Sequence, residues 1–186
     1  MRILIIKTSA TGDVVRTTAI LQAFPQASIS WITSRACFPL FDEITQARQN
    51  ENPESRLNEN SEKRLNENTR DCLKIFDIQD IPKSVLQETY DLVLSLEEDD
   101  FCAKLAASLN TRKLTGVYSN GKTRYTDDAA PWFDMSLISI YGKEYANSLK
   151  MANGRSYQDF LFGMIGRQFT GQPYRIYQPQ TDPKPN

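Results

Sequence analysis

The sequence predicts an α/β protein built on a Rossmann-like parallel sheet, and three observations support this. Short apolar segments rich in β-branched residues recur along the 186-residue chain, as they do in strands that are buried on both faces of a parallel sheet. Apolar residues at helical spacing follow several of these segments, which is the order of βαβ units. The first unit starts at the beginning of the sequence, with residues 2–7, a small polar turn and a helix.

Five strands are expected along the chain. Right-handed crossovers between them predict a sheet with the strand order 3-2-1-4-5. Ligands in such sheets lie where the carboxyl ends of the strands meet the helix N-termini, so the turn after the first strand is a candidate site. The expected strands are residues 2–7, 29–33, 73–78, 92–96 and 113–118.

The helices follow from the residues between these strands. Ser34 is expected to cap a short helix that runs through Phe41 and Ile44. An acidic turn at residues 97–100 precedes a helix through Leu105 and Leu109, and the Asn120-Gly121 turn ends the fifth strand. The helix after the first turn is indicated by the spacing of Val14, Val15, Thr18, Ile20 and Leu21.

The chain is expected to divide into a main domain and two C-terminal segments. Residues 1–131 form the Rossmann-like domain, residues 132–173 form helices, and residues 174–186 form a linker or tail rich in proline and glutamine. One face of the first of these helices is expected to carry Met135, Leu137, Ile138 and Tyr141.

Residues 48–71 contain three copies of an eight-residue unit with almost no apolar side chains. Such a tract cannot offset its ordering entropy by burial, so it is expected to be disordered. A tandem expansion tolerated in a surface loop is the favoured interpretation, because loops accept insertions at little cost. The alternative is a binding spacer.

Composition excludes several classes of function. The net charge of −1 gives no overall field that favours nucleic acid or an anionic membrane. Cys37, Cys72 and Cys102 are widely spaced, which indicates free buried thiols in a reducing compartment, and the cytoplasm is expected. The chain contains no histidine, which excludes nucleophile systems and zinc sites that use it, so a general base must be Asp, Glu, Lys or Tyr.

The first turn fits neither common phosphate-binding motif. A dinucleotide fingerprint needs three glycines, but only Gly12 is present, and Lys7 precedes the turn instead of closing it as in a P-loop. What remains is K-T-S-x-x-G-D. Gly12 is expected to allow a tight turn or the close approach of a ligand. Asp13 is either a helix cap or a general base that takes a proton from a sugar hydroxyl.

The opening segment MRILIIKTSATGDVVRTT resembles the start of glycosyltransferase family 9, the bacterial heptosyltransferases of lipopolysaccharide core assembly. That family begins with a strand and the pattern K-x-[ST]-x-x-G-D-[VI]. Residues 29–41 and 132–174 are similar to further segments of the family, whereas the octapeptide tract departs from it. The resemblance implies the N-terminal, acceptor-side domain of a GT-B glycosyltransferase fold.

The resemblance also implies a reaction and its residues. Asp13 would be the base of an inverting, metal-independent transfer without a cofactor, from a nucleotide-sugar donor such as ADP-heptose to a lipid A–Kdo core or related glycan. Thr8, Ser9 and Gly12 would shape the floor of the acceptor pocket, and Lys7 would help to position the substrate. Contact with the inner membrane would be peripheral at most.

Three further residues are candidates for acceptor binding. Glu97 follows the fourth strand at the carboxyl edge of the sheet, and ordinary solvated acidic residues are the alternative. Lys122 and Arg124, with Tyr125 beside them, follow the fifth strand and would meet anionic groups of the acceptor, unless they are ordinary exposed charges.

In family 9 a C-terminal domain binds the nucleotide-sugar, and the 186 residues contain no second glycine-rich turn for the donor diphosphate. The expected partner is therefore a separate C-terminal polypeptide, and the isolated chain is expected to be inactive. The alternative is a non-catalytic acceptor-binding module or a truncated remnant. Apolar surface is expected to be exposed on the helices after Trp132.

Overall fold

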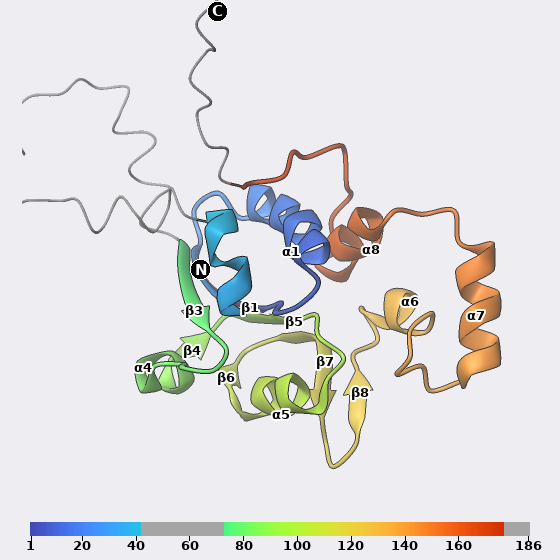
Figure 1. Ribbon diagram of the computed structural model, residues 1–186, viewed down its shortest axis with the longest axis horizontal. Coiled ribbons are helices and arrows are strands. Elements are labelled where there is room, and N and C mark those ends of the chain that lie inside the picture. The colour runs from blue at the N-terminus through green and yellow to red at the C-terminus, as the bar shows by residue number, and fades with distance from the viewer. Residues whose placement is uncertain (42–72, 177–186) are drawn as a thin grey trace, which may run out of the picture.

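The computed structural model describes residues 1–41 and 73–176 (Figure 1). Within them, a six-stranded sheet has the order β3-β2-β1-β5-β7-β8, parallel except for β8, which runs antiparallel to β7. The five parallel strands are those expected from the sequence, and their order confirms the predicted 3-2-1-4-5 arrangement. The strands are β1 (Arg2–Ile6), β2 (Ser28–Thr33), β3 (Leu73–Asp77), β5 (Leu92–Ser95), β7 (Leu114–Ser119) and β8 (Thr123–Tyr125).

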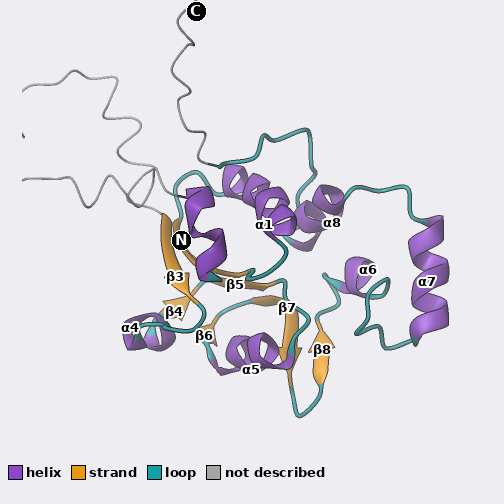
Figure 2. Ribbon diagram, viewed as in Figure 1, coloured by secondary structure: helices purple, strands orange, loops and turns teal. Residues whose placement is uncertain are grey.

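Helices cover both faces of this sheet, as Figure 2 shows by colour. A separate pair of two-residue parallel strands, β4 (Thr89–Tyr90) and β6 (Asn110–Thr111), lies beside it. The α-helices are α1 (Thr11–Thr17), α4 (Lys83–Gln87), α5 (Asp100–Ser108), α6 (Ala130–Phe133), α7 (Lys143–Ala152) and α8 (Tyr157–Met164), and the 3₁₀ helices are η1 (Thr18–Ala23) and η2 (Arg35–Phe41).

Alternate residues of β1 belong to two hydrophobic clusters on opposite faces of the sheet. Ile3 and Ile5 pack in the cluster that includes residues of α1, η1 and α8. Leu4 and Ile6 pack in the cluster that includes residues of α4 and α5. Side chains alternate across a strand, so a strand covered on both faces must be apolar throughout. This is the physical reason that apolar runs predicted the sheet so well.

The helices expected over residues 132–173 are present only in part. Between α6 and α7, residues 134–142 form turns, not a helix, so Met135, Leu137 and Tyr141 do not share a helical face. Gly142 ends this stretch with φ of 86°, a conformation that a helix interior does not use. The α8 helix begins at the capping box of Ser156 and Asp159, and its buried residues complete the main core.

Large apolar side chains are exposed between Leu137 and Met151. This confirms the expectation of exposed apolar surface after Trp132. Leu137 is 92% exposed and Met151 89% exposed, and Ile140, Tyr141 and Tyr145 are also exposed. In Figure 1, α7 projects away from the layers around the sheet. Ala146 is the buried residue of this helix.

Other expectations have mixed outcomes. Cys37 and Cys102 are buried and free, as predicted. Cys72, Ile44, the octapeptide tract and residues 177–186 lie outside the described residues. Among the helices that the structure describes, none has the length and apolar character needed to cross a membrane.

Gly116 allows β5 and β7 to pair closely, a requirement that the sequence did not reveal. Its φ is +106°, and an added Cβ would lie 1.9 Å from the carbonyl oxygen of Ser95. We expect Gly116→Ala to lower the free energy of unfolding by about 2 kcal/mol more than Gly121→Ala, because overpacking adds to backbone strain. Gly121 is the matched control, since its φ is +94° but its Cβ would meet open space. Equal urea midpoints for the two variants would contradict this prediction.

Tyr90 makes the stability sensitive to alkaline pH. Its hydroxyl donates to the carbonyl oxygen of Val85 at 2.9 Å, and burial raises the pKa of Tyr90 from 10.0 to about 12. The folded chain therefore holds the phenolic proton more tightly than the unfolded chain does. This contribution to stability is complete below pH 10 and is lost as the pH rises toward 12. Urea midpoints measured across this range should fall less steeply for Tyr90→Phe, and an unchanged slope would contradict the assignment.

Candidate functional site

The first βα turn, residues 7–10, is tied to the neighbouring strand by its backbone. The amide of Lys7 donates to the carbonyl of Ile32 at 3.1 Å, and the amide of Ser34 donates to the carbonyl of Thr8 at 3.3 Å. The indole of Trp31 donates to the carbonyl of Lys7 at 3.2 Å. These bonds fix the turn at the carboxyl edge of β1 and β2, where the sequence predicted a site.

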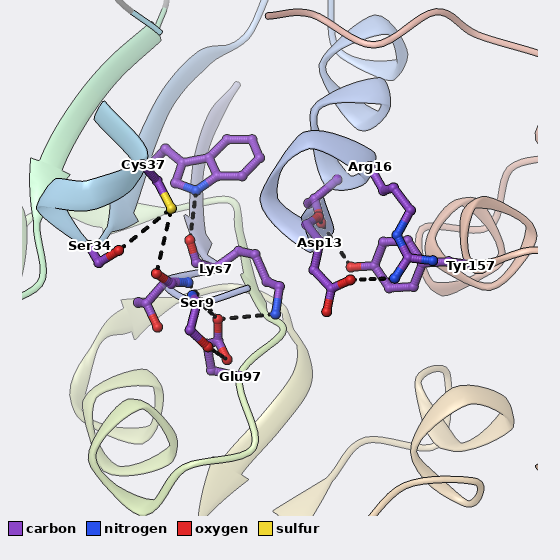
Figure 3. A network of polar contacts seen from close by, with 11 residues as sticks. Lys7, Ser9, Asp13, Arg16, Ser34, Cys37, Glu97 and Tyr157 are labelled. Carbon is purple, nitrogen blue, oxygen red and sulfur yellow. Dashed lines mark hydrogen bonds and ion pairs between the residues drawn. The ribbon is translucent and has the colours of Figure 1, made fainter. Parts of the chain in front are cut away.

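Glu97 holds the same turn from the other side. It follows β5, the other neighbour of β1, and its Oε1 accepts from the amides of Thr8 at 2.6 Å and Ser9 at 2.8 Å. Ser9 Oγ donates to Oε2 at 3.2 Å, and Lys7 Nζ lies 3.1 Å from Oε1. Figure 3 shows this cluster below the turn. The Lys7 and Glu97 side chains are only 8% and 9% exposed, so the pair is internal.

The Glu97 carboxylate occupies the backbone amides that would otherwise be available to bind an anion at the first turn. Backbone amides of a turn at this position are a common anion site in α/β sheets. Here Glu97 already accepts the amides of Thr8 and Ser9, so a phosphate would have to displace a buried carboxylate. Glu97 is also not the solvated acidic residue that the sequence allowed as its alternative. Its geometry is that of a residue that shapes the turn.

Gly12 does not make the tight turn expected of it. The left-handed conformation belongs to Ala10, with φ of 53°, and Gly12 lies inside the first turn of α1. A Cβ added at Gly12 would meet nothing within 4 Å. The prediction of a glycine-dependent turn was therefore wrong, whereas the open space beside Gly12 is compatible with the close approach of a ligand.

Asp13 is not a helix cap. The cap position of α1 is Ala10, whose carbonyl accepts from the amide of Asp13 at 2.7 Å. The Asp13 carboxylate instead forms an ion pair with Arg16, three residues further along α1. Its side chain is 36% exposed, so the carboxylate is within reach of a ligand in solution.

Tyr157 extends this arrangement into the core. The guanidinium of Arg16 lies over its ring, 4.9 Å from the centroid, and its hydroxyl is 2.8 Å from Thr17 Oγ1. Burial raises the pKa of Tyr157, so the phenol stays neutral and its ring supports the cation. Figure 3 shows Asp13, Arg16 and Tyr157 together, with the first two on α1 and the third at the start of α8.

A pocket of about 610 Å³ adjoins this network. Arg16 and Tyr157 belong to its wall, together with Glu98, parts of residues 132–137, α7 and the segment that begins α8. Its size lies in the range of small-molecule sites, about 300–1,000 Å³. Arg16 therefore connects Asp13 directly to the lining of a cavity.

Glu98 is the carboxyl group of this pocket. Burial raises its pKa above the usual value of 4.5, and hydrogen bonds from Ser136 and the Leu137 amide oppose that rise. The four residues of the acidic segment at 97–100 therefore make four different kinds of contact. Glu97 faces the turn, Glu98 faces the pocket, Asp99 caps α5 through the amide of Cys102, and Asp100 pairs with Lys104.

Lys122 and Arg124 lie at the edge of the sheet, away from the first turn. Arg124 lies on β8 and Lys122 in the hairpin before it, on the far side of β7 from β5. Among the described residues, no ion pair or side-chain hydrogen bond connects either of them to Asp13 or Glu97. The structure thus gathers Lys7, Thr8, Ser9 and Glu97, adds Gly12 and Asp13 on α1, and leaves the hairpin cations apart.

Sequence reasoning missed Arg16 and Tyr157, and it identified Glu98 only as one residue of the acidic segment after the fourth expected strand. The spacing of Asp13 and Arg16, three residues apart on a helix, was a usable signal. Tyr157 is 140 positions from its partner Thr17, so no local pattern could have revealed it. Searching the described residues for three or more clustered metal-ligating side chains finds no such group. Comparisons of the chain with protein-family models, curated proteins and solved structures find no match.

Proposed function

We propose that this chain is the acceptor-side domain of a heptosyltransferase-like glycosyltransferase, with Asp13 as the general base. One observation carries the proposal: an accessible carboxylate at the first βα turn lies next to a cation that lines a pocket of ligand size. The position of Asp13 within K-T-S-x-x-G-D supports the same assignment, through the resemblance of that segment to glycosyltransferase family 9.

The chemistry requires a base of this kind. Asp13 takes the proton of an acceptor hydroxyl while that oxygen forms a bond to the anomeric carbon of the donor sugar. The bond between that carbon and the nucleotide diphosphate breaks, and its electron pair leaves with the phosphate. The attack from the opposite side inverts the anomeric configuration. Carboxylates perform such proton transfers when they lie within hydrogen-bond reach of the hydroxyl.

The surrounding residues have separate tasks in this proposal. Lys7 and Glu97 hold the turn, with Thr8 and Ser9 bonded through their amides. The exposed Ser9 side chain and the open space at Gly12 are positions where the acceptor approaches Asp13. The internal use of the turn amides agrees with a domain that binds the acceptor and leaves the donor diphosphate to another domain.

A transfer assay tests the proposal. The chain is mixed with a donor-binding domain of a family 9 enzyme, ADP-heptose and a Kdo-containing acceptor, and the mass of the acceptor is followed. We expect addition of one heptose only when both polypeptides are present, because catalysis needs both reactants oriented together. No transfer with any donor domain would favour the alternative of a non-catalytic acceptor-binding module. The buried free thiols of Cys37 and Cys102 are consistent with the cytoplasm as the place of this reaction.

A further inference from the structure

The pocket beside α1 has a strongly cationic wall. Four cationic side chains line it, Arg16, Lys143, Lys150 and Arg155, against the single carboxyl group of Glu98. The cations come from α1, from α7 and from the segment before α8. Because the whole chain carries a net charge of −1, this concentration of positive charge is local and is not a reflection of composition.

The cations of α7 lie on one face of the helix. Positions 143, 147 and 150 are separated by four and three residues, so Lys143, Asn147 and Lys150 align along the pocket. A rise of 1.5 Å per residue places the two lysines about 10 Å apart along the axis. Among the described residues, no carboxylate forms an ion pair with Lys143, Lys150 or Arg155. Arg155 donates to the carbonyl oxygen of Asp159 at 3.2 Å and lies over the ring of Phe160, and Arg16 is paired with Asp13. An anion in the pocket would therefore supply the counter-charge chiefly for the two lysines of α7.

The remaining lining suits a small molecule with polar and apolar parts. Asn147, Asn153 and Gln158 provide amide groups, while Trp132 and Tyr157 provide aromatic surface. Such a mixture of apolar walls and a few convergent polar groups is typical of small-molecule sites. The amides and cations are donors for phosphate or carboxylate oxygens.

We propose that this pocket binds a ligand with two or more phosphate or carboxylate groups, and that the ligand competes with Asp13 for Arg16. Arg16 makes both connections, since it is paired with Asp13 and lines the pocket. When an anion engages the guanidinium, Asp13 loses its partner and is free to accept a hydrogen bond from an acceptor hydroxyl. This second step rests on the proposed function of Asp13, whereas anion binding does not.

Calorimetric titration with inorganic pyrophosphate tests the pocket in the full chain. We expect one site, with affinity reduced roughly tenfold by Lys150→Gln or Arg155→Gln, the loss of one charge-assisted hydrogen bond. Lys104→Gln is the matched control, because Lys104 pairs with Asp100 on α5 and does not line the pocket. Binding that is equal in all variants would overturn the assignment of the pocket.

Vesicle sedimentation identifies the source of the anionic groups. Binding to phosphatidylglycerol vesicles that pyrophosphate reverses would assign the pocket to headgroups at a membrane surface. Binding of pyrophosphate without sedimentation would assign it to a free anionic solute. Failure of both pyrophosphate and the vesicles to bind would overturn the proposal.

Competition for Arg16 has its own test. Because coupling between two sites is reciprocal, removing the charge of Asp13 should strengthen pyrophosphate binding. We expect Asp13→Asn to bind several-fold more tightly, Arg16→Gln to bind more weakly, and the Asp13 effect to vanish in the double variant. Asp100→Asn, which removes the same charge from α5, controls for net charge. An equal gain in Asp100→Asn, or a gain that persists without Arg16, would contradict the competition. These measurements need no transfer activity, so their failure and failure of the proposed function are distinguishable.

Discussion

Asp13→Asn should reduce sugar transfer by about 10²- to 10⁴-fold, the range expected when a general base is removed. The asparagine side chain has nearly the same shape but cannot accept the proton of the acceptor hydroxyl. The loss should occur without unfolding, because the Asp13 carboxylate is partly exposed and its described side-chain partner is Arg16. The measurement is the steady-state rate in the two-polypeptide transfer assay, with urea unfolding of each variant alongside.

Two further variants sharpen this prediction. Asp100→Asn removes a carboxylate from α5, on the opposite face of the sheet from α1, where it pairs with Lys104, and should leave the rate unchanged. Arg16→Gln leaves the base in place and should change the rate far less than Asp13→Asn does. Transfer by Asp13→Asn at the rate of Asp100→Asn would remove Asp13 from the mechanism.

Glu97→Ala should lower the free energy of unfolding by about 3–5 kcal/mol, the usual loss when one partner of a buried ion pair is removed. The change removes the counter-charge of the Lys7 ammonium, which is buried because the Lys7 side chain is only 8% exposed. It also removes the acceptor of the Thr8 and Ser9 amides. Urea unfolding followed by tryptophan fluorescence measures the effect, since Trp31 donates to the backbone of the same turn.

Matched variants separate the buried pair from a surface pair. Glu88 pairs with Arg2 at the surface, so Glu88→Ala should cost no more than about 0.5 kcal/mol. The double variant Lys7→Met/Glu97→Leu should recover part of the loss, because no buried charge is then unpaired. Recovery should stay incomplete, since the two turn amides still lack an acceptor. Equal urea midpoints for Glu97→Ala and Glu88→Ala would contradict the internal role of Glu97.

The sheet could be predicted from sequence because its determinants are local. A strand buried on both faces must be apolar at successive positions, and residues 3–6 and 92–94 satisfy this condition. Handedness rules then restrict the strand order to few arrangements. The hairpin strand β8 was missed because its three residues are only partly buried and carry no apolar run.

The failures concern places where distant parts of the chain meet or where the backbone departs from a regular conformation. Residues 134–142 contain apolar side chains at helical spacing, yet the chain there forms turns, and Leu137 is exposed. Ala10 adopts the left-handed conformation expected for a glycine. Local propensity does not decide such positions, because tertiary contacts override it.

The position of the first turn at the carboxyl edge of the sheet was predicted correctly, but the contacts around it could not be predicted. The motif K-T-S-x-x-G-D marked the turn and Asp13. Glu97 lies 89 positions from Thr8, and Tyr157 lies 140 positions from Thr17. Only the folded chain therefore shows that Glu97 holds the turn and that Tyr157 supports Arg16. The result is a buried ion pair that fixes the backbone and an accessible carboxylate beside it.

A single-turnover measurement tests the assignment of Asp13 most directly. With the chain and a donor-binding domain in excess over ADP-heptose, the rate of the chemical step is separated from binding and product release. The proposal predicts that Asp13→Asn slows this step by about 10²-fold or more while the acceptor concentration for half-saturation changes little. An unchanged single-turnover rate for Asp13→Asn would contradict the role of Asp13 as the base.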